Sequence, residues 1–326
     1  MRIASKYIAR RILNSIIIIF LTLIIAFVIP RLSPGDPVDI MQQTYGLSNE
    51  EAEAIRERLG LKGNILEQFI TYMSYLLRGD LGRSYSYNMR PVSEVILTAL
   101  PWSLFLLGVA ITIRVLIGVL LGIYFARKQG SLLDTSVSGI MSLILATPYF
   151  LLALIFLYVF SVKLNLFPLS HAYTYESIQK GFSIEFIIDV LRHSALPIIT
   201  LVIIGLPSTF YTMKNNMILL LNEDFVYVLR AVGIRESRVT RIVARNAILP
   251  VVTSTAISFG YTVVGAVVAE TIFSYPGMGY VLTNALLNKD YPLIQAIFLM
   301  LSITIVMANL IADILYAFLD PRVELR

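Results

Sequence analysis

Six stretches of this chain are long and apolar enough to cross a membrane as helices. A helix that crosses about 30 Å of hydrocarbon needs roughly 20 mostly apolar residues, because each residue adds about 1.5 Å. Hydrophobic residues make up 57% of the chain and charged residues only 14%, whereas about a quarter of an ordinary soluble domain is charged. We therefore predict an all-α polytopic membrane protein with spans at residues 8–29, 100–126, 133–160, 196–219, 249–273 and 293–318.

The first of these spans follows a basic N-terminus and could be taken for a secretory signal. Its apolar run is longer than the core of a signal peptide, and no small-x-small cleavage pattern follows it. We therefore expect a retained anchor. The chain contains no cysteine, so disulfides and thiolate metal sites are excluded.

Lysine and arginine next to the spans predict how the chain is oriented. Residues 30–98 form a long connection, whose charges count little under the positive-inside rule. Of the other connections, one side holds only Lys163, Lys180, Arg192 and Lys289. The opposite side is richer and is predicted to be cytoplasmic, together with both termini, in the cytoplasmic membrane. Its basic residues are Arg2, Lys6, Arg10, Arg11, Arg127, Lys128, Lys214, Arg230, Arg235, Arg238, Arg241, Arg245, Arg322 and Arg326.

The long segment at residues 30–98 is predicted to carry a small extracytoplasmic helical element. Ser48 and Glu51 form a capping-box pattern, and Gly60 is suited to end that helix. A second helix is expected from about Asn64 to Gly79, since apolar residues recur there at helical spacing. They are Leu66, Phe69, Ile70, Met73 and Leu77. An unstructured linker is the alternative interpretation.

A basic segment at residues 220–249 interrupts the apolar chain on the predicted cytoplasmic side. Asn222 is suited to cap a short helix, Glu223 and Asp224 suit its first turn, and Gly233 suits its end. The apolar residues of this helix are Phe225, Val226, Leu229 and Val232.

A second helix is expected after Gly233, with Pro250 in the first turn of the next span. Its arginines fall within an arc of roughly 120° at 100° per residue, with small apolar residues opposite. The arginines are Arg235, Arg238, Arg241 and Arg245, and the opposite residues are Val239, Val243 and Ala247. Inner loops are commonly basic, which alone explains the charge. The apolar side of the short helix instead indicates contact with a partner protein.

These residues resemble the cytoplasmic EAA loop of ABC importer permeases. Ala231 and Gly233 form the Ala-x-Gly turn, and Leu249 with Pro250 enters the next span. The long spacer and the ArgAsnAlaIleLeuPro sequence at residues 245–250 are similar to the oligopeptide and dipeptide branch. Val228, Leu229 and Val232 depart from the usual pattern. Further stretches of that branch are RLSPGDP at 31–37, GDLGRS at 79–84, PV at 91–92, ETIFSYPGMG at 270–279 and DPRV at 320–323.

The resemblance implies the type I ABC importer fold and an arrangement of three parts. Residues 1–29 would form the cytoplasmic tail and first span, residues 30–98 the extracytoplasmic element, and residues 99–326 a five-helix permease core with a coupling loop at 220–249. Contact with the ATPase is implied for Asn222, Glu223, Asp224, Phe225, Val226, Tyr227, Leu229, Arg230, Ala231, Gly233, Ile234, Arg235 and Arg238.

Partners are implied by the same resemblance: a second homologous permease in a heterodimer, two ABC ATPase subunits, an extracytoplasmic substrate-binding protein and membrane lipid, but no nucleic acid. A phosphate-binding GxxxxGK[ST] loop is required for ATP hydrolysis, and no Gly-Lys dipeptide occurs here. We therefore expect a transporter permease without enzyme activity or bound cofactor, with ATP and Mg on the partner subunits.

Three charged residues are predicted within or near the membrane: Arg114, Glu270 and Asp313. Such residues usually face a cavity or a partner. Arg114 is expected either to pair with Asp313 or Glu270 or to line the translocation path. Both histidines, His171 and His193, are expected at solvated positions of an outer loop.

The predicted function is the permease subunit of an ATP-driven importer, forming half of the path for oligopeptides, dipeptides or similar solutes. Family members for oligosaccharides or nickel chelates leave the substrate open. An ion-coupled secondary transporter, which would use its intramembrane charges without an ATPase, is one alternative, and a membrane scaffold without transport activity is another.

Overall fold

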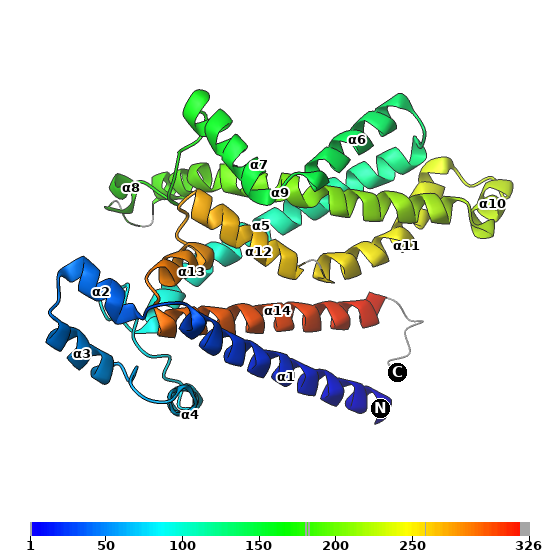
Figure 1. Ribbon diagram of the computed structural model, residues 1–326. Coiled ribbons are helices and arrows are strands. Elements are labelled where there is room, and N and C mark those ends of the chain that lie inside the picture. The colour runs from blue at the N-terminus through cyan, green and yellow to red at the C-terminus, as the bar shows by residue number, and fades with distance from the viewer. Residues whose placement is uncertain (1, 180, 182, 258, 320–326) are drawn as a thin grey trace. The chain divides into compact units, whose positions relative to one another are not determined.

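The computed structural model describes residues 2–179, 181, 183–257 and 259–319, with side chains for residues 13–179, 181, 183–256, 259–260, 262–308 and 310. Every regular element in this part of the chain is helical (Figure 1). The chain divides into two compact units, each of which contains residues distant in sequence. The first comprises Met1–Trp102 and Gly277–Val306, and the second comprises Ser103–Pro276 and Met307–Arg326.

Among the described residues, four helices are long and apolar enough to span a membrane. They contain apolar windows at Leu13–Leu32, Val92–Arg127, Ile184–Leu221 and Tyr291–Ala308. These windows confirm the predicted spans at residues 8–29, 100–126, 196–219 and 293–318. The helices that carry them are α1 (Arg2–Leu32), α5 (Val92–Arg127), α9 (Ile184–Leu221) and α14 (Tyr291–Leu319).

The predicted span at residues 133–160 is not one continuous helix. α6 (Leu132–Ala146) ends before Pro148, and α7 (Tyr149–Phe156) starts after a bend of 106°. Proline forces the preceding residue away from helical geometry, and Thr147 is accordingly extended at φ −90° and ψ 129°. α7 continues as a π-helical segment, η1 (Leu157–Lys163). If the bent pair is one span, the described residues contain five candidate spans.

The predicted span at residues 249–273 is divided between α11 (Glu236–Ile257) and α12 (Phe259–Ile272), on either side of residue 258, which lies outside the described residues. Pro250 lies inside α11, so its prediction in the first turn of a span was wrong. Val243, Ala247 and Val251 are fully buried on both sides of the proline. This packing holds the helix together although Pro250 lacks the backbone donor of a helical hydrogen bond.

The first unit is centred on α13 (Met278–Leu287) and on the N-terminal parts of α5 and α14. Its core includes Val92, Val95, Met278, Leu293 and Ile297. Asp290, between α13 and α14, is fully buried and binds the loop that precedes α5. Its Oδ2 accepts hydrogen bonds from Ser84 Oγ at 2.5 Å, Ser86 Oγ at 2.6 Å and the backbone N–H of Ser86 at 2.9 Å. These contacts join residues more than 200 positions apart, so no local sequence pattern predicts them.

The element predicted at residues 30–98 is folded, so the alternative of an unstructured linker was wrong. It consists of α2 (Pro37–Tyr45), α3 (Asn49–Arg58) and α4 (Ile65–Leu77). The capping box of Ser48 and Glu51 is confirmed, and the backbone N–H of Ser48 lowers the pKa of the Glu51 carboxyl. Gly60 is left-handed at φ +65°, and α4 starts next to Asn64 as predicted, with Asn64 as its N-cap.

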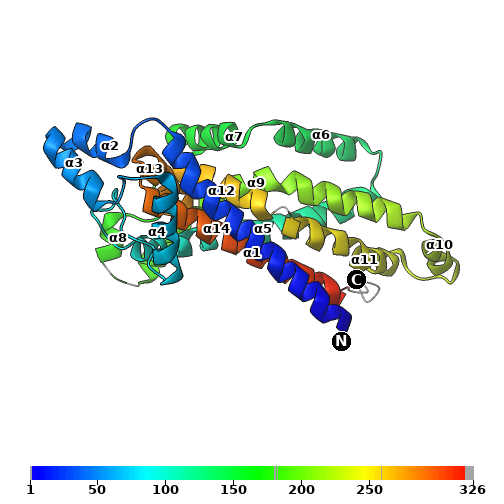
Figure 2. The ribbon, with the colours of Figure 1, turned by 60° about the horizontal axis from the view of Figure 1, so that its bottom comes forward.

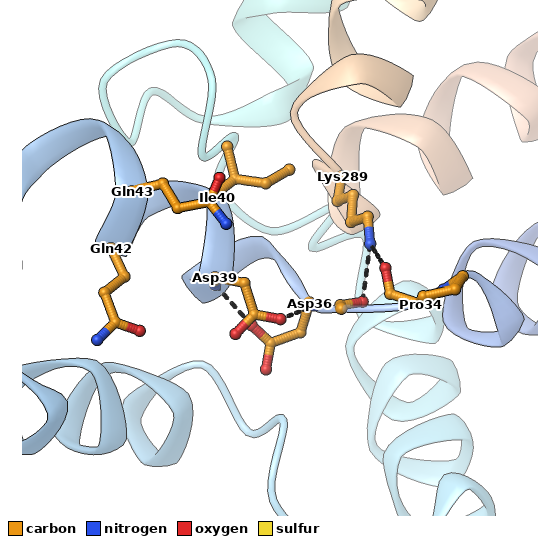
Figure 3. Close-up of a pocket in the computed structure, with 8 residues that line it drawn as sticks. Pro34, Asp36, Asp39, Ile40, Gln42, Gln43 and Lys289 are labelled. Atoms are coloured by element: carbon orange, nitrogen blue, oxygen red, sulfur yellow. Dashed lines mark hydrogen bonds between the residues drawn. The ribbon is translucent and has the colours of Figure 1, made fainter.

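A second capping box at the start of α2 was not predicted. The side chains of Asp36 and Asp39 each accept the other's backbone N–H, and Arg56 of α3 bridges the two carboxylates at 2.7 and 2.5 Å. Figure 3 shows the two aspartates beside Lys289, whose ammonium donates to the carbonyl oxygens of Pro34 and Gly35. An open pocket of about 500 Å³ lies here, lined by Pro34, Gly35, Asp36, Asp39, Ile40, Gln42, Gln43 and Lys289.

In the second unit, α9 packs closely on α5 through two glycines. A Cβ at Gly118 would lie 2.8 Å from the Thr209 side chain. A Cβ at Gly122 would lie 2.6 Å from Met213 Cβ and 3.0 Å from the backbone nitrogen of Lys214. The missing side chains therefore permit the close contact of the two helices. This unit also contains the short α8 (Tyr175–Gln179).

Replacing Gly122 with alanine should destabilise the helical bundle of the second unit by about 1–3 kcal/mol, because the new methyl group meets backbone as well as side-chain atoms. The free energy of unfolding in a detergent titration would measure the effect. Gly108→Ala is the matched control, since Gly108 lies in the same helix and its Cβ would meet no atom within 4 Å. Equal stability of the two variants would show that the close contact is not needed.

Candidate functional site: an exposed helix between α9 and α11

The short helix predicted in the basic segment is α10 (Asp224–Ala231). Asn222 does not cap it, so that prediction was wrong. Asn222 instead ends α9, where its side chain donates to the carbonyl oxygen of Ile218 at 3.0 Å. Glu223 takes the N-cap position in an extended conformation, without a side-chain capping bond. α9 therefore passes into α10 with only a single turn between them.

The end of α10 is closed by two backbone hydrogen bonds and an ion pair. Gly233 is left-handed at φ +83°, as predicted, and its N–H donates to the backbone carbonyl oxygen of Arg230. The N–H of Ile234 donates to the carbonyl oxygen of Leu229 at 3.1 Å. This arrangement is the glycine-based helix end. Arg230 also donates to Glu236 at 2.7 Å, which lowers the pKa of that carboxyl and ties α10 to the first turn of α11.

One side of α10 packs on the second unit. Val226 is fully buried in a cluster formed by α9, α11 and the end of α5. Leu229 and Ile234 pack partly buried on the same cluster. The other buried members of the cluster are Ala126, Met213, Met217, Val239, Val243, Ala247 and Val251. α10 is thus fixed to two long helices rather than hanging from a loose loop.

The other side of α10 is apolar and open. Tyr227, Val228 and Val232 are 58%, 60% and 75% exposed, and Ala231 between them is exposed as well. Figure 1 shows α10 at one end of α9, with α7 and α8 towards the opposite end. A group of exposed apolar side chains at the tip of a helical unit is typical of a contact surface. We call Tyr227, Val228, Ala231 and Val232 the tip face.

The arginines lie on the exposed side of α11, as predicted, with Arg235 just before its first residue. Arg235, Arg238, Arg241 and Arg245 are exposed. The opposite residues Val239, Val243 and Ala247 are fully buried. α11 is therefore amphipathic, with a basic surface next to the tip face.

Arg114 is buried where α5, α9 and α12 meet. Its Nη1 donates to Thr262 Oγ1 at 3.1 Å, and its Nε has no hydrogen-bond partner. Gly205 makes room for it, because a Cβ there would lie 2.6 Å from Nη1. Glu270, also buried, accepts a hydrogen bond from Ser103 Oγ at 2.6 Å. The side chain of Asp313 lies outside the described residues, so its pairing with Arg114 stays a prediction.

Comparison with known proteins decides what this architecture belongs to. Residues 118–325 match the family described as binding-protein-dependent transport system inner membrane component, and residues 4–106 match the N-terminal part of such membrane components. The chain belongs to this family. It is therefore the permease subunit of a binding-protein-dependent ABC importer and not itself an enzyme.

Several relatives match the permease over almost its whole length. A putative peptide permease protein of Brucella suis biovar 1 (strain 1330) is 35% identical over 98% of this chain and 99% of its own. The oligopeptide transport system permease protein AppB of Bacillus subtilis (strain 168) is 34% identical with the same coverage. The di/tripeptide transport system permease protein DppB of Pseudomonas aeruginosa (strain UCBPP-PA14) is 34% identical over 98% of both chains.

A buried ion pair in the permease was missed by the sequence analysis. Lys214 of α9 donates to Asp134 of α6, and also to Ser138 Oγ at 2.9 Å. Both charged residues are buried. Lys214 was grouped with the residues of the cytoplasmic loops, yet it lies inside α9, which extends to Leu221. Its place within a predicted span was the only available signal, since Asp134 is 80 residues away.

The two histidines differ from each other. His171 is exposed, as predicted. His193 is buried, so its prediction as a solvated loop residue was wrong. α9 begins at Ile184 rather than near residue 196, and this longer helix places His193 Nδ1 3.2 Å from Asp189 Oδ1.

Proposed function

We propose that this permease imports peptides across the cytoplasmic membrane, and that the tip face of α10 receives the force for transport from an ATPase subunit. The observation that carries the proposal is the exposed apolar tip face on a helix that is otherwise firmly fixed. An isolated surface valine needs no explanation, but three large apolar residues around Ala231 favour a protein partner.

The way α10 is fixed suits it to transmit force. A displacement of α10 moves α9 and α11 with it, because Val226 is buried in the cluster to which both helices contribute and the Arg230–Glu236 pair joins α10 to α11. Rigid packed elements shift as units rather than deform continuously. Movement of the ATPases would therefore rock the second unit and open the path to alternate sides.

The partners follow from the function. A second homologous permease completes the path in a heterodimer, two ABC ATPases bind ATP and Mg, and a substrate-binding protein delivers the cargo. The positive-inside pattern supports cytoplasmic termini and a cytoplasmic tip face. The arginines of α11 would then also lie on the cytoplasmic side.

The residues implied by the resemblance have four roles in this coupling surface. The tip face contacts the ATPase, Arg235 and Arg238 offer charge beside it, and Val226, Leu229 and Ile234 anchor the helix. Asn222, Glu223, Asp224 and Phe225 flank its start. Arg114, Glu270 and Asp313 serve the translocation path or its intramembrane pairing.

The names of the relatives support peptides as cargo, since they describe peptide, oligopeptide and di/tripeptide transport. Uptake by the assembled complex in proteoliposomes tests the whole proposal. Labelled di- and oligopeptides should accumulate only with ATP and the substrate-binding protein, and a protonophore should not stop them. Accumulation of an oligosaccharide or nickel chelate instead would reject the cargo alone. Uptake driven by an ion gradient without ATPases would reject the mechanism.

A further inference from the structure

The apolar side chains of α4 occupy more of its circumference than packing requires. Phe69, Tyr72 and Met73 lie on the side that is half-buried in the first unit. Leu66, Ile70 and Leu77 are 62%, 60% and 83% exposed. At 100° per residue these three fall within about 40° of one another, directly beside the packed side. We call them the α4 stripe.

The polar residues of α4 lie on a separate side. Glu67, Thr71 and Ser74 are exposed and fall within about 60° of one another on the helical projection. The helix thus has a packed side, an exposed apolar stripe and an exposed polar side, in that order. A helix surrounded only by water would have no reason to separate the last two.

The contacts of α4 place it beside the C-terminal end of the apolar window of α1. Phe69 and Tyr72 contact Phe27 of α1, with ring centroids 5.1 and 5.7 Å apart. Phe27 lies inside the apolar window Leu13–Leu32, five residues before its end, which corresponds to about 7.5 Å along a helix. Ile29 and Leu32, beyond Phe27, are still apolar and exposed. The lipid surface of α1 therefore continues past the level at which α4 packs.

Arg31, near the end of α1, makes a polar contact with α4 at the same place. The guanidinium carbon of Arg31 lies 3.6 Å from the centroid of the Phe27 ring, and its Nε donates to Gln68 Oε1 of α4 at 3.1 Å. Arginine at a span end, with its head directed to polar partners, is characteristic of the membrane–water boundary. Tyr75 and Arg78, both exposed, add an aromatic and a basic group of the kind found at this boundary.

The direction of α4 agrees with this position. Figure 1 views α4 nearly along its axis while α1 runs across the picture, and Figure 2 also shows α4 crosswise to α1. If α1 crosses the membrane, α4 lies along its surface. We propose that α4 is an interfacial helix whose stripe is inserted among lipid acyl chains, with Glu67, Thr71 and Ser74 facing the headgroups and water.

Two observations favour lipid over a protein partner as the neighbour of the α4 stripe. The stripe is at the depth of the exposed apolar end of α1, and α4 and the residue that ends it also carry Tyr75 and Arg78, which are residue types found at the membrane–water boundary. The proposal concerns only the membrane contact of the first unit, so it does not depend on peptides as cargo or on force at α10.

Spin labels can test this directly, because the chain has no cysteine of its own. The labelled variants I70C and L66C report on the stripe, and T71C is the matched control on the polar side of the same helix. Each labelled permease is assembled with its partner subunits in phosphatidylcholine vesicles. Collision rates are then measured with oxygen, which concentrates in acyl chains, and with a nickel chelate, which stays in water.

The expected result is that oxygen collisions exceed those of the nickel chelate at I70C and L66C, with the order reversed at T71C. A nickel-accessible stripe would overturn the proposal by showing a solvated helix. Low accessibility to both reagents at I70C would overturn it in favour of a protein neighbour. If substrate-binding protein added to the vesicles removes the oxygen collisions, the stripe is a docking surface and the lipid proposal is wrong.

Discussion

Ala231→Trp should reduce peptide uptake at least tenfold while the permease still inserts and assembles. Ala231 lies in the centre of the tip face and is exposed, so a larger side chain can project from the surface without entering the packed cluster. A bulky ring there would hold the ATPase away from Tyr227 and Val228, and a tenfold loss corresponds to about 1.4 kcal/mol. Uptake and ATP hydrolysis by the same proteoliposomes measure the effect. Hydrolysis should persist without stimulation by the loaded substrate-binding protein.

Ser237→Trp is the control for this prediction. Ser237 is also small and exposed, and it lies in the first turn of α11 outside the tip face. The importer with the Ser237→Trp permease should take up peptide at the normal rate. Gly233 is a poorer site for the test, since any side chain at its left-handed φ adds strain of about 1–2 kcal/mol. Normal uptake by Ala231→Trp, or an equal loss in both tryptophan variants, would argue against force transmission through the tip face.

Asp134→Ala should destabilise the permease by about 3–5 kcal/mol, because it leaves the ammonium of buried Lys214 without its counter-charge. Lys214 loses one of its two polar contacts with α6 and keeps the hydrogen bond to Ser138 Oγ. Unfolding of the purified permease in a detergent titration gives the free energy directly. The loss should be larger than that of the Gly122→Ala variant.

The double variant Asp134→Leu with Lys214→Met separates the charge effect from packing. Removing both charges together and filling the space with apolar groups should recover most of the lost stability, since a buried pair contributes little over well-packed apolar residues. A single variant as stable as the unmodified permease would show that Lys214 does not need Asp134. A double variant as unstable as the single one would show that volume, not charge, is decisive.

The spans that could be predicted are those for which length and hydropathy suffice. α1, α5, α9 and α14 each contain an unbroken apolar window, and such a window is a property of local sequence. Hydropathy does not predict that the helix breaks at Pro148, because a proline in an apolar run is compatible with a kinked as well as a broken helix. The continuation of α11 through Pro250 depends on the burial of Val243, Ala247 and Val251. This burial results from tertiary packing, which a local sequence pattern does not reveal.

The candidate site was predictable where its signals are local. Gly233 ends α10 through its own backbone conformation, and the alternation of arginine and valine in α11 needs only helical periodicity. The cap at Asn222 was predicted wrongly because the residue suits the end of α9 equally well. The Lys214–Asp134 pair and the Asp290 anchor join residues far apart in sequence, and local patterns carry no information about such pairs.

The central claim is that the tip face of α10 touches an ATPase on the cytoplasmic side. Because the chain lacks cysteine, Tyr227→Cys introduces a single reactive thiol into the permease. Cross-linking of the assembled importer in right-side-out vesicles, followed by identification of the linked subunit, tests the claim most directly. We predict a link to the ATPase and protection of the thiol from an impermeant maleimide added outside. A link to the substrate-binding protein, or labelling from outside, would contradict the account.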